Sequence, residues 1–240
     1  RCGEHVLVFD SGTGVRGLGL ALAAERVSDI DMFLSHTHID HGSGLPFFCF
    51  AFSSGNALRT LAGHLMPDYT VEAVLRSLIN APLFPVPIDI FKARLSFRDF
   101  IAGDTLDPKP GVHIRTAALN HPNRATGYRV EYQGRSICYV TDTEHVPGRP
   151  DQNVLDLIQG ADIVVYDAMF DDAGHAQHIG WGHSSWEEGL RLCKAAGVKT
   201  PVLFHHLPGR TDAELDQIAA AADLVFPGAI IAREGLVLTP

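Results

Sequence analysis

The stretch Ser35-His36-Thr37-His38-Ile39-Asp40-His41 places three imidazoles and one carboxylate within six residues. It follows a short apolar segment, residues 31–34, which predicts a β-strand. His36 and His38 are two residues apart, so in extended backbone they point the same way and can ligate one cation. Asp40 and His41 lie at the turn and can reach a second cation. The stretch therefore predicts a metal site at a strand end, with a mononuclear site and a solvated His-rich loop as the alternatives.

Three further candidate ligands each follow a predicted strand: His121, Asp142 and His205. Strand ends can bring such residues together, and one carboxylate can give an oxygen to each of two cations, which suits Asp142 to a bridging position. His205 and His206 are not separated by the pattern, because adjacent strand residues point to opposite faces. The position directly after Leu203-Phe204 favours His205.

Outward from these residues, the sequence predicts a mixed α/β chain with no internal repeat. Gln133-Gly134 predicts a hairpin turn. Ser184 with Glu187, and Thr211 with Glu214, have the spacing of capping boxes at helix starts. The expected strands cover residues 6–10, 31–34, 93–97, 113–117, 127–132, 136–141, 163–166, 202–204, 229–232 and 236–238, and the expected helices cover residues 18–26, 71–80, 184–196 and a last segment from 211.

The composition indicates an ordinary globular protein. At 240 residues we expect a single domain, residues 1–240, with residues 45–105 as an insertion or lid over the site. The apolar stretches are far shorter than the ~20 residues of a membrane-spanning helix, and no leader precedes Val6, so we expect a cytoplasmic protein. The formal charge of −9 argues against a long nucleic acid and favours a small substrate. The four cysteines include no CxxC pair, which indicates buried thiols.

The HxHxDH stretch, followed at long spacing by His121, Asp142 and His205, resembles the metallo-β-lactamase superfamily over nearly the whole chain. The segments 10–14, 141–143 and 182–184 are similar to the branch that contains ribonuclease Z and the phosphoribosyl cyclic phosphodiesterase. The resemblance implies a four-layer αββα sandwich of two sheets with helices outside. The chain differs in lacking the long arm by which ribonuclease Z grips tRNA, and in starting at Arg1 without Met, which suggests that a hairpin precedes it.

The same resemblance implies two divalent metal ions, zinc first and manganese or iron as alternatives. Carried over by motif, the first ion would be held by His36, His38 and His121, the second by Asp40, His41 and His205, and both by Asp142.

Because that branch of the superfamily cleaves phosphodiesters, the resemblance implies a dinuclear metallo-hydrolase, a phosphodiesterase that attacks a small or cyclic phosphodiester with a metal-bound hydroxide. Asp40 would orient the hydroxide. His183 resembles the histidine of the His-Ser-Thr segment in the ribonuclease Z branch and would protonate the leaving group, unless it merely ends a loop. Asp10 and Asp167 would each accept a hydrogen bond from a ligand imidazole, or simply cap a strand end.

Two other functions remain open. One is hydrolysis of a lactone, thioester or β-lactam at the same site, because a metal-bound hydroxide can also attack a carbonyl carbon. The other is a metal-bound sensing module with little turnover. A homodimer is an open alternative to a monomer. His175 and His178 are expected to be solvated loop residues.

Overall fold

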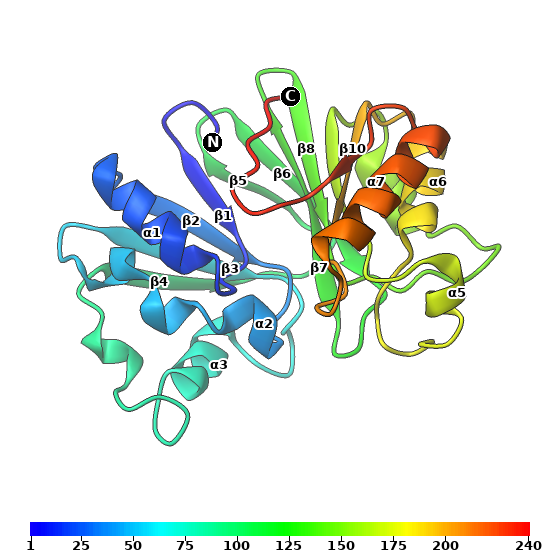
Figure 1. The fold of residues 1–240 in the computed structure, drawn as a ribbon. Helices are drawn as coiled ribbons and strands as arrows, with labels where there is room; N and C mark the ends of the chain where they lie inside the picture. The colour runs from blue at the N-terminus through cyan, green and yellow to red at the C-terminus, as the bar shows by residue number, and fades with distance from the viewer. The chain divides into compact units, whose positions relative to one another are not determined.

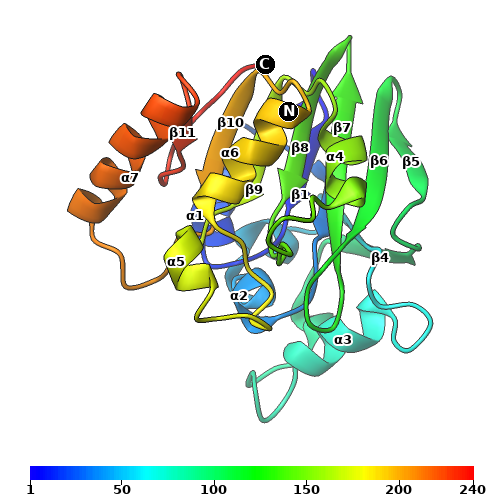
Figure 2. The ribbon, with the colours of Figure 1, turned by 90° about the vertical axis from the view of Figure 1, so that its right-hand side faces the viewer.

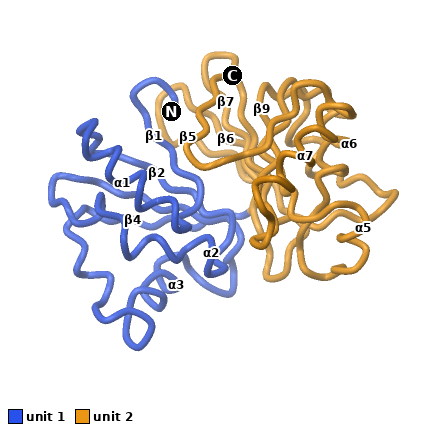
Figure 3. Tube along the Cα trace, viewed as in Figure 1, with its two compact units in different colours: residues 1–101 blue, residues 102–240 orange.

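The computed structural model describes residues 1–240, which divide into two compact units, residues 1–101 and residues 102–240 (Figure 3). Each unit is built on one β-sheet. None of the helices combines the length and the apolar character that crossing a bilayer requires.

The first unit contains a four-stranded parallel sheet with the strand order β1-β2-β3-β4 (Figure 1). Helix α1 and helix α3 contribute Leu22 and Leu75 to the core, which also contains Ile30 and Met32 of β2. The strands are β1 (Val6–Phe9), β2 (Asp29–Leu34), β3 (Ala57–Ala62) and β4 (Arg94–Asp99). The helices are α1 (Val15–Ala24), α2 (Ile39–Gly42) and α3 (Val71–Leu78), with 3-10 turns at Leu45–Phe47, Cys49–Phe52 and Ile88–Ile90.

Strand β3 is absent from the sequence expectations, and its sequence explains why. Arg59 and Thr60 interrupt an otherwise apolar run. Arg59 lies in the sheet because its guanidinium pairs with Asp29 and Asp31 of the neighbouring strand. Strands β3 and β4 both fall within residues 45–105, so much of that region is part of the first sheet. A lid formed by this region stays a prediction.

The second unit contains a seven-stranded mixed sheet with the order β11-β10-β9-β8-β7-β6-β5 (Figure 2). Strands β8 to β11 are parallel to one another, while β5 to β8 alternate in direction. The strands are β5 (Thr105–Lys109), β6 (Val112–Leu119), β7 (Ala125–Tyr132), β8 (Arg135–Val140), β9 (Ile163–Asp167), β10 (Thr200–Phe204) and β11 (Ile230–Ile231). The helices are α4 (Gln152–Ile158), α5 (Asp172–His175), α6 (Trp186–Ala195) and α7 (Asp212–Val225).

Helices α4 and α6 cover one face of this sheet. Leu157 and Leu192 pack with Val140 and Val164 in a buried cluster. Helix α7 packs instead on the β10–β11 end of the sheet, where Ala222 contacts the cluster that contains Leu203.

Most local expectations in the second unit are confirmed, with two corrections. Gln133 and Gly134 have φ values of 49° and 75°, the positive values that a two-residue hairpin turn of type I′ requires. Thr211 forms the predicted capping box with Glu214. Helix α6 is capped by Ser185 rather than Ser184, because Ser185 accepts the hydrogen bond from the backbone of Glu188. Residues 236–238 form no strand.

Candidate functional site

In the first unit, Asp10 directly follows β1 and accepts hydrogen bonds from residues 35–41, called here the histidine loop. Its Oδ1 accepts from the backbone N–H of Ser35 at 2.7 Å, and its Oδ2 accepts from Ser35 Oγ and His41 Nδ1, both at 2.8 Å. Asp10 is 8% exposed and has a φ of 61°, an unusual value for a residue other than glycine. This strand end therefore directs the carboxylate toward the ring of His41.

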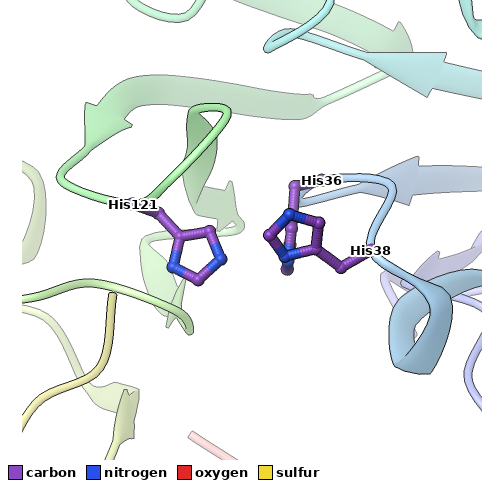
Figure 4. A group of neighbouring side chains, drawn as sticks. All are labelled: His36, His38 and His121. Atoms are coloured by element: carbon purple, nitrogen blue, oxygen red, sulfur yellow. The ribbon is translucent and has the colours of Figure 1, made fainter. Parts of the chain in front are cut away.

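His36 and His38 project from the loop that follows β2 (Figure 4). Their ring centroids are 4.5 Å apart at 80°, and the ring of His41 lies 4.2 Å from that of His36. His41 Nε2 is 3.2 Å from Asp40 Oδ2, and the Asp40 side chain is 59% exposed. The three imidazoles and the carboxylate of the motif are thus clustered in the histidine loop, whose last residues, Asp40 and His41, belong to the short helix α2.

Two glycines allow this loop to pack closely on the turn after β1. The backbone of Ser11 donates to the carbonyl of His41 at 2.8 Å and accepts from Gly44 at 2.8 Å. A Cβ on Gly12 would lie 2.5 Å from the carbonyl oxygen of Asp40, and a Cβ on Gly44 would lie 2.0 Å from the carbonyl oxygen of Gly12. The Ser-Gly-Thr-Gly segment is a turn that supports the histidine loop.

In the second unit, strand direction collects the other candidates at one edge of the sheet. Because β6 runs antiparallel to β7, and β7 antiparallel to β8, strand β6 has the same direction as β8, β9 and β10. The residues at their carboxyl ends therefore meet at one edge, where α/β folds generally place their sites. These residues are His121, Asp142, Asp167 and His205.

Asp142, Asp167, His183 and His205 form a compact group in which one ligand atom from each lies within 4.8 Å of the others. His183 Nδ1 is 2.9 Å from Asp167 Oδ2 and 3.7 Å from Asp142 Oδ1. The rings of His183 and His205 stack with centroids 4.9 Å apart. Asp167 is fully buried and also accepts from the backbone N–H groups of Thr143 and Met169.

The structure separates His205 from His206. His205 Nε2 is 3.4 Å from Asp142 Oδ1, whereas His206 Nε2 is 3.3 Å from the carbonyl oxygen of Ala232. His205 has a φ of 56°, which turns the chain at the end of β10. Burial lowers the pKa of His206. His205 is thus the histidine that joins the strand-end group.

His121 occupies the turn after β6 (Figure 4), where its Nδ1 is 2.8 Å from the carbonyl oxygen of Gly182. Gly182 has a φ of 84°, and a Cβ there would lie 2.3 Å from His121 Nδ1, so no other residue fits. Glu144 Oε2 accepts from the backbone N–H groups of Gly180 and Gly182, both at 2.8 Å. The loop 180–182 is thereby fixed against the ring of His121.

The donor atoms fit divalent ions. The Nδ1 atoms of His41 and His121 face oxygen acceptors and therefore carry the proton, which places the lone electron pair of each ring on Nε2, the atom that can ligate a metal. Asp40 and Asp142 supply carboxylate oxygens, and mixed imidazole and carboxylate ligation suits zinc, manganese and iron.

Several residues around these groups have no signal in the sequence analysis. Glu144 and Gly182 act through backbone contacts, which no spacing rule reveals. His64 is 5% exposed and its Nε2 is 3.1 Å from Thr37 Oγ1. The expectation that His175 is solvated is wrong: it is 1% exposed and stacks on His145 with centroids 3.8 Å apart.

Comparisons with known proteins agree with this geometry. Residues 5–206 match the family model of the beta-lactamase superfamily domain. A ribonuclease Z from Treponema pallidum (strain Nichols) is 24% identical, and the match covers 98% of this chain and 88% of that protein. Among solved structures, the metallo-beta-lactamase fold protein YhfI from Bacillus subtilis superposes with a TM-score of 0.73 at 19% identity, covering 100% of this chain and 89% of that one. The short form of human tRNase Z gives a TM-score of 0.70 at 19% identity, covering 100% and 90%.

The structural matches confirm the expected metallo-β-lactamase fold class, a mixed α/β chain with two sheets and helices. Since the family model spans residues 5–206, most of the chain, this protein belongs to the beta-lactamase superfamily.

Proposed function

We propose that this protein is a metal-dependent phosphodiesterase that hydrolyses a small or cyclic phosphodiester. The observation that carries the proposal is the contact between His183 and Asp167 beside Asp142. This contact fixes an imidazole ring at the edge of the sheet where the proposed metal ligands Asp142 and His205 also lie. The ribonuclease Z relative supports phosphodiester chemistry, and the acidic charge of the chain supports a small substrate.

The proposed ligands are those of the motif, and the single domain of residues 1–240 stays a prediction. His36, His38 and His121 would hold one ion, Asp40, His41 and His205 the other, and Asp142 both. When bound, two such ions, zinc in our proposal, supply Lewis acidity toward a phosphoryl oxygen and a lowered pKa for a water molecule.

His183 has the arrangement of a general acid. Its Nδ1–H donates to the buried carboxylate of Asp167 at 2.9 Å, which fixes the orientation of the ring. The imidazolium form of a ring held in this way can give its Nε2 proton to the ester oxygen as the phosphorus–oxygen bond breaks. This help matters most for an alkoxide leaving group, which departs poorly without a proton.

Asp40 is the residue proposed to orient the attacking water. Its side chain is more than half exposed, unlike the enclosed carboxylates of Asp10 and Asp167, so one oxygen can accept a hydrogen bond from water.

The test is hydrolysis of bis-p-nitrophenyl phosphate by protein of measured zinc content, with a lactone and a cephalosporin as competing substrates. We expect His183→Ala to lower kcat about 10²-fold or more for a 2′,3′-cyclic nucleoside monophosphate, whose leaving group is an alkoxide, with zinc retained. The loss should be smaller for bis-p-nitrophenyl phosphate, because p-nitrophenolate leaves without a proton. Asp142→Ala should lose both zinc and turnover. His113→Ala is the matched control, because His113 is an exposed histidine of β6 paired with Asp107 on β5, away from the strand edge. Zinc-loaded protein that opens only the lactone or the cephalosporin would favour the carbonyl hydrolase, and zinc-loaded protein with no turnover would favour the sensing module.

A further inference from the structure

A cavity of about 350 Å³ lies within the first unit, between the histidine loop and helix α3. Its size is at the lower end of the range of about 300–1,000 Å³ for small-molecule sites, so it suits one part of a substrate. Its walls are formed by the loop, by one face of α3 and by the segments on either side of α3, and include His36, Thr37, Tyr69, Val74, Leu78 and Leu83.

The cavity is neutral and largely apolar. No Asp, Glu, Lys or Arg is among its lining residues, so it disfavours a charged group, which would lose its hydration there without gaining a partner. Tyr69 and Leu83 are 65% and 72% exposed. A ligand that covers large exposed apolar side chains beside a cavity removes their apolar surface from water, and this burial favours binding.

His36 connects this cavity to the proposed metal site. His36 is one of the residues that line the cavity, and its Nδ1 is 3.1 Å from the hydroxyl of Ser35, which donates to Asp10. A phosphoryl group held by the histidine loop therefore has its substituent next to an apolar wall.

We propose that this cavity binds an uncharged aromatic ring, of the kind that a nucleoside or an aryl ester carries, on one arm of the phosphodiester. The inference rests on the proposed function and adds the substrate class. Tyr69 supplies a ring for stacking, and Thr37 and Ser77, two residues with hydroxyl groups, also line the cavity. A hydroxyl can form a hydrogen bond to the polar edge of a heteroaromatic ring, although that of Thr37 also contacts His64 Nε2. A simple alkyl arm would use the apolar wall but neither of these features.

The test measures binding of three phosphonates to the zinc-loaded protein by calorimetry: methylphosphonate, butylphosphonate and phenylphosphonate. Ala73→Leu narrows the cavity without touching the core, because Ala73 is an exposed residue of α3 that lines it. Ala21→Leu is the matched control, an exposed helical alanine of α1 that does not line the cavity. Tyr69→Ala is a second variant that removes the stacking ring.

We expect phenylphosphonate to bind the wild type about tenfold more tightly than methylphosphonate, the gain of one well-packed ring. Ala73→Leu and Tyr69→Ala should each remove most of that preference, and Ala21→Leu should keep it. The KM for bis-p-nitrophenyl phosphate should rise in Ala73→Leu with kcat unchanged.

Equal binding of the phenyl and methyl compounds would overturn the proposal, as would an equal loss of both in Ala73→Leu. Butylphosphonate binding as tightly as phenylphosphonate would overturn the aromatic assignment. Absence of phosphodiester turnover would contradict the proposed function instead, and the phosphonate affinities would still decide whether the cavity binds a ring.

Discussion

Replacement of Asp10 by asparagine tests how the histidine loop is held. The carboxylate receives three donors: the backbone N–H of Ser35, the hydroxyl of Ser35 and Nδ1–H of His41. An asparagine has one oxygen and one NH₂ group in place of the two oxygens. If its NH₂ group faces the backbone N–H of Ser35, two hydrogen-bond donors face each other, and neither can become an acceptor.

The opposite orientation of the introduced asparagine costs less but changes His41. The Ser35 hydroxyl can rotate to accept from the amide, whereas His41 Nδ1 accepts only if its proton moves to Nε2. A protonated Nε2 has no electron pair for a metal. We therefore expect zinc affinity to fall about 10- to 100-fold, the usual effect of losing such an outer hydrogen bond. The unfolding free energy of the metal-free protein should fall by about 1–3 kcal/mol, because a buried charged acceptor is lost.

Zinc affinity is measured by competition with a chromophoric chelator, and stability by urea unfolding in EDTA. Asp31→Asn is the control, since Asp31 is a buried carboxylate of the same unit that pairs with Arg59 rather than with a histidine. It should lose stability and keep its zinc affinity. Wild-type zinc affinity in Asp10→Asn, or an equal loss of affinity in the control, would show that Asp10 does not set the proton position on His41.

Three further predictions concern stability. Gly44→Ala should lower the free energy of unfolding in urea by about 1–3 kcal/mol, because the added Cβ would clash with the backbone of Gly12. Gly17→Ala is the control: its Cβ has open space on helix α1, so this variant should raise the free energy of unfolding by up to about 1 kcal/mol. Similar effects of the two variants would show that Gly44 is not needed for the close packing of the two backbones. The pKa of Asp162 is lowered to about 2 from the ordinary 3.8, and the largest cause is the hydrogen bond from Lys199. The carboxylate therefore stabilises the fold above about pH 4, and this stabilisation is lost as the pH falls toward about 2. Asp162→Asn should therefore be about 1 kcal/mol less stable than wild type at pH 7, a modest value because the cations are exposed to solvent, and a pH series of unfolding curves that stays parallel down to pH 2 would contradict this. Thr211→Ala should cost about 1 kcal/mol, read as a lower Tm by circular dichroism, and an unchanged Tm would mean that the capping box adds nothing.

Elements with a strong local signal can be read from the sequence alone. The HxHxDH stretch is detectable because all its donors lie within six residues, and the turn at Gln133-Gly134 and the cap at Thr211 depend only on neighbouring residues. Strand β3 is not detectable, because Arg59 breaks its apolar pattern and is accommodated only by carboxylates on another strand.

The tertiary structure is needed to show which polar residues meet. His205 rather than His206 faces Asp142, because the left-handed backbone at the end of β10 sets the direction of the side chain. His183 contacts Asp167, which is 16 residues away in the sequence. Glu144 accepts a hydrogen bond from the backbone N–H of Gly182, which is 38 residues away. Such contacts depend on the order and direction of the strands, which are set by the packing of the whole sheet. The spacing of residues in the sequence therefore does not predict them.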